Sequence, residues 1–297
     1  MTDPLRPAIA TASPIHEFTP NMPENATYFQ GHHESVLRAH SWRTAQNSAA
    51  YLLKYLQPTM RILDVGCGPG TITTSFARLV PQGHVTGLDN ATADSNSDVL
   101  AKARQHAVEQ GVTNVTFAHG DVCNLEGIPD GMYDVVHCHQ VLQHVVDPVR
   151  ALTEMRRVAK QGGLVAAREA DSGTLAWFPE TETMETWIQV YRAVARANGT
   201  EPDAGRRLVK WALEAGFARD VIDVTAGTWC FSTPEERAWW GGVWADRTLN
   251  STFASHAVEK GFADRGTLER IAGHWREWAE REDGWFALLH GEIVCRV

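Results

Sequence analysis

The stretch Leu63-Asp-Val-Gly-Cys-Gly-Pro-Gly70 decides the fold: an apolar run ends in a turn with three alternating glycines. Residues 61–65 have the composition of a buried strand, and residues 71–79 show helical spacing. Glycines at such a turn let the backbone approach a ligand closely, and the first turn of the next helix offers unpaired N–H groups. The stretch therefore predicts a strand, a ligand-binding turn and a helix in succession.

The same alternation continues along the chain. Further strands are expected at residues 84–88, 115–118, 133–137 and 164–168, and helices at 98–110 and 148–159. Asp147 before Pro148 is a good helix start, because a carboxylate caps the N-terminus and proline suits the first helical position. Strands alternating with helices predict a doubly wound α/β fold, in which a mostly parallel sheet is covered on both faces.

The second half has a different character. Residues 172–204 are expected to be a helical insertion, clearest at 187–197, followed by a helix at 206–215 and a strand near 221–225. Thr233-Pro-Glu-Glu236 has the form of a capping box, residues 239–282 read as helical, and 285–297 as a strand. Ten of the eleven tryptophans lie beyond residue 170. Most are expected in the core, and a minority in an apolar acceptor pocket, with Trp177, Phe178, Trp240 and Trp244 as candidates.

These patterns suggest four parts. Residues 1–24, interrupted by five prolines, are expected to be a flexible arm. Residues 25–57 would form a helical cap, with helical spacing over 34–56. Residues 58–171 would form a cofactor-binding α/β core, and residues 172–297 the remainder of the sheet with a helical lid over the acceptor.

Composition excludes several classes of protein. The formal net charge is -9 and no Lys/Arg run provides a basic face, which argues against a nucleic-acid partner. No apolar stretch approaches the roughly 20 residues that span a bilayer, and no secretory signal opens the chain. The five cysteines lack CxxC spacing, as expected of reduced thiols. We expect a cytoplasmic protein with a small-molecule partner, and the sequence leaves its oligomeric state open.

Carboxylates follow three successive predicted strands: Asp64, Asp89 and Asp121. The carboxyl ends of parallel strands meet at one edge of the sheet, where such folds bind ligands. Three carboxylates there would repel the pyrophosphate of a dinucleotide, and the glycine spacing is G-x-G-x-G rather than G-x-G-x-x-G. S-adenosylmethionine instead brings a sulfonium, an ammonium, a ribose diol and an adenine amine. The pattern favours this cofactor, and a nicotinamide-dependent oxidoreductase is the alternative.

On these motifs the chain resembles the class I S-adenosylmethionine-dependent methyltransferases, and within them the UbiE-type group of small-molecule enzymes. The resemblance covers about residues 28–170 and implies a Rossmann-like sheet of seven strands. It implies that the glycine loop (Asp64, Gly66, Gly68 and Gly70) holds the methionine part of the cofactor, Asp89 its ribose, and Asn90, Asp121 and Val122 its adenine. It places His139 and Gln140 at the methionine end. In the cap, it assigns Tyr28, Arg38 and the stretch Ser41-Trp-Arg-Thr44 to closure over the cofactor.

The segment Gln140-Val-Leu-Gln-His144 resembles the family's stretch after the fourth strand, with Gln143 where many relatives have a histidine. This departure makes His144 a weak candidate for a general base, and catalysis by positioning is favoured because the methyl donor is already activated. His32-His33 and His137-x-His139 raise the question of a metal. No third ligand accompanies them, so no metal is expected.

The acceptor is indicated by resemblance alone. The stretch Gly31-His-His-Glu-Ser-Val-Leu-Arg38 and the tryptophan-rich tail resemble fungal UbiE-type enzymes of secondary metabolism. Some of these methylate dithiols of the gliotoxin type, so S-methylation of a small thiol or dithiol is favoured. Oxygen or carbon methylation of a polyketide- or quinone-like ring is the alternative. A regulator that binds the cofactor without catalysis is another.

Overall fold

The computed structural model describes residues 42–90 and 99–297, which form a sheet of eight strands. The strand order is β3-β2-β1-β4-β5-β8-β6, and β7 pairs with the other edge of β8. Strands β1 to β5 are parallel to one another, whereas β8 is antiparallel to β5, β6 and β7. The strands are β1 (Arg61–Val65), β2 (His84–Asp89), β3 (Val115–His119), β4 (Tyr133–His139), β5 (Ala159–Ala170), β6 (Ala176–Phe178), β7 (Ile222–Phe231) and β8 (Trp285–Arg296).

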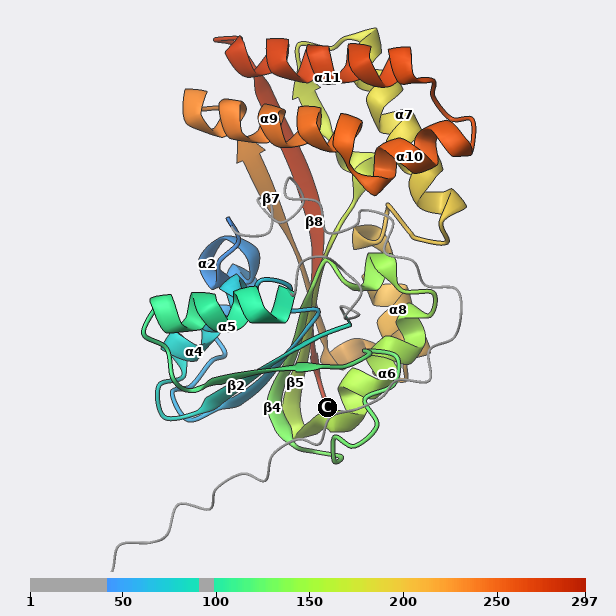
Figure 1. Ribbon diagram of the computed structural model, residues 1–297. Helices are drawn as coiled ribbons and strands as arrows, with labels where there is room; N and C mark the ends of the chain where they lie inside the picture. Colours follow the sequence, from blue (N-terminus) through green and yellow to red (C-terminus); the bar gives the residue numbers. More distant parts are fainter. Residues whose placement is uncertain (1–41, 91–98) are drawn as a thin grey trace, which may run out of the picture.

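Helices cover both faces of this sheet, which confirms the doubly wound α/β fold (Figure 1). Strands β1 and β4 are buried almost throughout, as expected of parallel strands between two helical layers. One layer contains α2 (Ala45–Ser48), α3 (Ala50–Leu53), α4 (Thr71–Leu79) and α5 (Val99–Glu109). The opposite layer contains α6 (Pro148–Val158) and α8 (Leu208–Glu214). Short 3-10 turns are η1 (Leu142–His144), η2 (Ser172–Thr174), η3 (Gly205–Arg207) and η4 (Arg219–Val221).

The ends of β7 and β8 extend past the parallel strands to a separate group of helices, which we call the upper lobe (Figure 1). It consists of α7 (Glu182–Ala197), α9 (Pro234–Asn250), α10 (Thr252–Glu259) and α11 (Arg265–Glu280). Its core is aromatic, and Trp187, Trp275, Trp278 and Phe286 are almost completely buried in it. Most of the tryptophans of the second half therefore do serve as packing residues.

The capping predictions are confirmed, and several element lengths differ from expectation. Asp147 caps α6, and Thr233 with Glu236 forms the capping box of α9. The stretch 239–282 is three helices rather than one, because Ser251 is extended and Asp264 starts a new cap. Strands β5 and β7 are longer than predicted, because both pair along β8 and β5 also begins earlier, with Ala159 opposite Tyr133 of β4. The sheet has eight strands rather than seven within the described residues, because three-residue β6 continues the edge of β8.

Of the helical cap expected at residues 25–57, the structure describes only the part from residue 42, which holds two short helices. The proposed arm, Tyr28 and Arg38 lie outside the described residues. In the two described ranges, no helix combines the length and apolar character needed to span a membrane.

Gly291 of β8 provides a test of how η3 packs against the sheet. A Cβ on Gly291 would fall on the backbone carbonyl of Gly205. Gly291→Ala should therefore lower the free energy of unfolding by about 1–3 kcal/mol, as overpacking does. Urea denaturation measures the change. Gly242→Ala in α9 is the matched control, because its Cβ would point into open space. An unaffected Gly291→Ala variant would contradict this packing.

Candidate active site

The glycine loop between β1 and α4 has the backbone that its sequence predicts. Gly66, Gly68 and Gly70 have φ angles of 67°, 52° and 75°, which residues with a Cβ rarely adopt. A Cβ on Gly66 would overlap the Val141 side chain, and one on Gly70 would lie 2.8 Å from Ala103 and Phe117. Gly70 is also the N-cap of α4. The loop thus forms a tight cradle at the N-terminus of a helix, as a close backbone contact with a ligand requires.

Asp64 holds this cradle in place from within the protein. Its carboxylate accepts a hydrogen bond from the Thr73 hydroxyl in α4 at 2.6 Å, and it lies 2.7 Å from Nδ1 of His137 in β4. Asp64 and His137 are also register partners, and both are buried. Asp64 therefore joins β1, β4 and α4 beneath the loop, which positions the loop.

Asp89 and Asp121 lie at the ends of the next strands, as predicted. Asp89 accepts a hydrogen bond from the backbone N–H of Gly68 at 2.8 Å, which fixes the middle of the cradle to β2. Asp121 accepts one from the Cys123 backbone N–H at 2.8 Å in the turn after β3. Asn90 is exposed beside Asp89, whereas the Val122 side chain is buried, which leaves its backbone for contact.

A second set of polar residues follows β4. His139 is buried, and its Nε2 lies 3.0 Å from the Arg168 guanidinium. Arginine only donates, so Nε2 accepts from Arg168, while the Arg43 guanidinium lies 3.4 Å from Nδ1 on the other side of the ring. Burial, with the charges of Arg43 and Arg168, holds the pKa of His139 well below its usual range. His139 is therefore a neutral partner in this network.

Gln140 links the cradle to the second half of the chain. It accepts a 2.6 Å hydrogen bond from Arg43, and its amide nitrogen lies 2.9 Å from Nε2 of His290 in β8. Among the described residues outside glycine, only Gln140 has a positive φ, at 54°. Strained backbone of this kind is typical of functional sites. The next residue, Val141, packs against Gly66.

Glu169 anchors the loop that carries Gln140. This fully buried carboxylate on β5 accepts hydrogen bonds from three successive backbone N–H groups, those of Val141, Leu142 and Gln143, at 2.9, 2.8 and 3.3 Å. Burial raises its pKa to about 7, although these hydrogen bonds oppose the shift. Sequence reasoning missed Glu169, because its partners lie in a different segment.

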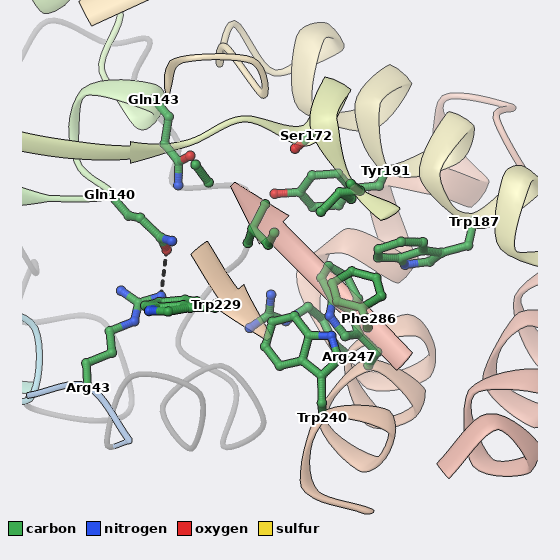
Figure 2. Close-up of a pocket in the computed structure, with 14 residues that line it drawn as sticks. Arg43, Gln140, Gln143, Ser172, Trp187, Tyr191, Trp229, Trp240, Arg247 and Phe286 are labelled. Atoms are coloured by element: carbon green, nitrogen blue, oxygen red, sulfur yellow. Dashed lines mark hydrogen bonds between the residues drawn. The ribbon is translucent and has the colours of Figure 1, made fainter. Parts of the chain in front are cut away.

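An aromatic pocket opens between the sheet and the upper lobe, beside Gln140 (Figure 2). Its enclosed volume is about 60 Å³, and the space rises to about 600 Å³ when the open mouth is included. The predicted Trp240 and Trp244 line it, whereas Trp177 and half-exposed Phe178 do not. The lining is formed by Arg43, Gln140, Gln143, Ala170, Ser172, Leu175, Trp187, Tyr191, Trp229, Trp240, Trp244, Arg247, Phe286 and Leu288.

His144 lies at the end of η1, behind this lining. Its Nε2 is 3.0 Å from the Gln143 amide nitrogen. Burial, with the charges of Arg43 and Arg247, lowers the pKa of His144 to about 3. The ring is therefore neutral at physiological pH and a weak proton acceptor.

The cradle fits the group that the sequence suggests. A loop without side chains, a helix N-terminus and the carboxylates of Asp89 and Asp121 suit the methionine, ribose and adenine parts of S-adenosylmethionine. In residues 42–90 and 99–297, no cluster of three histidine, cysteine or acidic side chains could hold a metal.

The Gly66 contact yields a test of the cradle. Gly66→Ala should raise the dissociation constant for S-adenosylmethionine at least tenfold in calorimetry, because the methyl group would push Val141 and strain the loop. Gly111→Ala is the control: its φ of 64° carries the same strain, but its Cβ would meet nothing nearby. Equal affinities in both variants would refute the role of the Gly66–Val141 contact.

The raised pKa of Glu169 predicts a pH-dependent stability. The folded protein holds this proton more tightly than the unfolded chain, so the stabilisation is lost as pH rises from about 4.5 to about 7. Glu169→Gln cannot ionise, so its stability relative to the wild type should improve across this window, by on the order of 3 kcal/mol at most. Urea denaturation at a series of pH values measures the difference. A difference independent of pH would show that Glu169 ionises normally.

Comparison with known proteins agrees with this geometry. The Methyltransferase domain family matches residues 56–216, from the end of the cap to the turn after α8. An uncharacterized methyltransferase of Schizosaccharomyces pombe is 36% identical over 91% of this chain and 96% of its own length. The probable methyltransferase ltbC of Aspergillus luteorubrus is 30% identical over 90% of this chain and 96% of its own.

Among solved structures, a phosphoethanolamine N-methyltransferase of Haemonchus contortus in complex with S-adenosyl-L-methionine has the same fold. It has a TM-score of 0.54 and 17% identity, covering 93% of this chain and 62% of that one. With the glycine cradle and the carboxylates at the strand ends, these matches establish the family: the chain belongs to the class I S-adenosylmethionine-dependent methyltransferases.

Proposed function

We propose that this methyltransferase transfers the methyl group to the sulfur of a small thiol or dithiol bound in the aromatic pocket. The observation that carries the proposal is the composition of the lining. Among the described lining residues there is no carboxylate and no imidazole. The pocket therefore suits an acceptor that loses its proton without a general base.

The free pKa values of possible acceptors decide between them. A thiol titrates near 8.5 and a phenol near 10, so a thiolate forms more readily at neutral pH. The guanidinium groups of Arg43 and Arg247 in the lining favour an anionic acceptor further. His144, the candidate base of the sequence analysis, has a pKa lowered to about 3 and lies behind the lining. It contributes little as a proton acceptor.

S-adenosylmethionine supplies an activated methyl group, and the chain provides alignment. The glycine loop, Asp89 and Asp121 would hold the cofactor, while Gln140 lies between that loop and the pocket. The acceptor sulfur forms a bond to the methyl carbon as the carbon–sulfonium bond breaks, and the bonding pair remains on the departing thioether. The thiol proton passes to solvent before the attack. Alignment of this kind contributes on the order of 7–11 kcal/mol.

Aromatic walls exclude water from the attacking atom. Trp187, Trp229, Trp240 and Trp244 line the pocket, and all four are buried. Aromatic side chains provide a large contact area with few rotatable bonds, so they hold a small acceptor at low entropic cost.

The proposal also includes that this enzyme belongs to the UbiE-type group and acts in fungal secondary metabolism. This part of the proposal rests on the sequence motifs.

A panel of acceptors with matched shape tests the atom that is methylated. Methyl-labelled S-adenosylmethionine is supplied with benzene-1,2-dithiol, catechol, hydroquinone or 1,2-diaminobenzene, and the products are followed by mass spectrometry. We expect label on the dithiol, at least tenfold faster than on catechol, with a rate that rises with pH to a plateau below the free thiol pKa.

Two results would contradict the proposal. Label on the oxygen or carbon of catechol or hydroquinone alone would establish the alternative acceptor class. No label on any compound, with cofactor binding confirmed by calorimetry, would favour a regulator that binds without catalysis. Trp240→Ala is the companion variant: it should raise the KM for the dithiol and leave cofactor affinity unchanged.

A further inference from the structure

The Gln140 side chain stands at the junction of the cofactor loop and the aromatic pocket. It lines the pocket, and the next residue, Val141, packs against Gly66 of the loop. The backbone is held as well, because the N–H of Gln140 donates to the carbonyl oxygen of Arg168 at 2.8 Å. The orientation of the Gln140 amide therefore decides which polar group is presented at this junction.

Arg43 fixes which end of the amide is which. The oxygen and nitrogen atoms of a side-chain amide are told apart by their hydrogen-bond partners. A guanidinium only donates, so the atom that lies 2.6 Å from Nη2 of Arg43 is the Gln140 oxygen (Figure 2). The amide nitrogen is then the end that faces β8, where it lies 2.9 Å from Nε2 of His290.

His290 must accept this hydrogen bond. An amide nitrogen only donates, so Nε2 of His290 carries no proton, and the neutral ring carries its proton on Nδ1. The ring is completely buried and packs against Trp229, with 4.4 Å between the ring centres. Burial, with the positive charges of Arg168 and Arg43, lowers the pKa of His290 well below its usual range, although backbone groups oppose the shift. The acceptor is therefore both neutral and fixed in place.

The amide nitrogen of Gln140 has two N–H groups, and His290 takes one of them. The hydrogen bonds formed within residues 42–90 and 99–297 leave the second N–H unused. An amide is planar, so the contacts of Arg43 and His290 at its two ends also fix the direction of this second N–H. A donor that is fixed before a ligand binds loses little entropy when it forms its hydrogen bond.

We propose that His290 is a positioning residue, which holds the Gln140 amide so that its second N–H is a fixed donor to an oxygen or sulfur atom of the acceptor. His290 is not among the described residues of the lining, so it acts through Gln140. The inference rests on the proposed function only in taking the aromatic pocket as the acceptor site. It is independent of which atom is methylated.

Histidine NMR tests the orientation of the amide without any acceptor. Long-range proton–nitrogen spectra of the full chain with isotope-labelled histidine distinguish the two neutral tautomers and the imidazolium. The signals that vanish in His290→Gln identify His290. We expect the Nδ1–H tautomer across about pH 6 to 8. An Nε2–H tautomer or a protonated ring in this range would overturn the inference.

Gln140→Glu should give the reciprocal result in the same spectra. A carboxylate only accepts, so His290 has to donate from Nε2, and its proton should move there or the ring should become protonated. Gln143→Glu is the matched control: Gln143 lies in the same loop and faces His144 instead, so His290 should keep its Nδ1–H tautomer. An unchanged His290 in Gln140→Glu would refute the contact on which the inference depends.

Binding of catechol and o-xylene tests the donor. The two compounds have similar shapes, and only catechol has acceptor atoms. In ligand-observed NMR titrations of protein saturated with S-adenosylhomocysteine, His290→Leu should lower the affinity for catechol at least about threefold relative to that for o-xylene. His290→Gln should not, because its side-chain oxygen can accept in place of Nε2. His106→Leu, at a partly exposed position of α5, is the control and should change neither affinity.

Equal effects of His290→Leu on the two compounds would show that the residue only packs, and would overturn the inference. If His290→Leu fails to fold by circular dichroism, Gln140→Leu takes its place and should also weaken catechol binding selectively. Absence of binding of both compounds to the wild type would refute the choice of this pocket, and with it the inference. None of these measurements involves methyl transfer, so a failure of S-methylation in the labelling experiment remains a separate result.

Discussion

The twelve-residue strand β8 has backbone N–H and C=O groups along both of its edges, and these groups need hydrogen-bond partners. Their pairing joins the cofactor side of the site to the aromatic pocket. On one edge it pairs with β5 from Arg296 to His290 and with β6 from Ala287 to Trp285. On the other edge it pairs with all ten residues of β7. Strands β7 and β8 pair antiparallel over ten residues and continue past the edge of the parallel strands into the upper lobe (Figure 1). The aromatic pocket is placed beside the cofactor loop for this reason.

Buried polar contacts fix the other side of the pocket. Asp64 joins Thr73 and His137 below the glycine loop, and Glu169 binds three consecutive N–H groups of the next loop. Each carboxylate compensates donors that burial would otherwise leave without partners. The two loops meet where Val141 packs against Gly66.

The cofactor half of the site could be predicted from sequence, because its signals are local. The glycines at 66, 68 and 70, and carboxylates directly after apolar runs, can be interpreted from a few neighbouring residues of the chain. Most of the pocket could not be predicted. Arg43 meets Gln140 across 97 positions, and Gln140 meets His290 across 150. The i, i+4, i+7 spacing of Trp240, Trp244 and Arg247 was visible, but which face of α9 meets the pocket depends on packing against α11 and β7.

Dependence on packing also explains why two of the predicted pocket residues, Trp177 and Phe178, do not line the pocket. Trp177 and Phe178 belong to β6, whose short pairing with β8 places Trp177 against Trp187 and leaves Phe178 half exposed. Composition alone identifies an aromatic region, and only strand register distinguishes the wall of a pocket from its outer support. Three-residue β6 carries too weak a pattern for that register to be predicted.

Charge is divided across the site in a way that suits the proposed S-methylation. Asp89 and Asp121 lie on the cofactor side, and Arg43 and Arg247 on the acceptor side. Burial and neighbouring guanidinium groups hold the pKa values of His139, His144 and His290 low, so these imidazoles add no positive charge to the acceptor side. Attack of an anionic sulfur on a sulfonium converts two charges into two neutral thioethers. A pocket walled by tryptophan and poor in water solvates separated charges weakly, so it favours a transition state in which they are already being neutralised. A neutral amine would leave a positive charge on the acceptor side beside Arg43 and Arg247, and this arrangement therefore disfavours it.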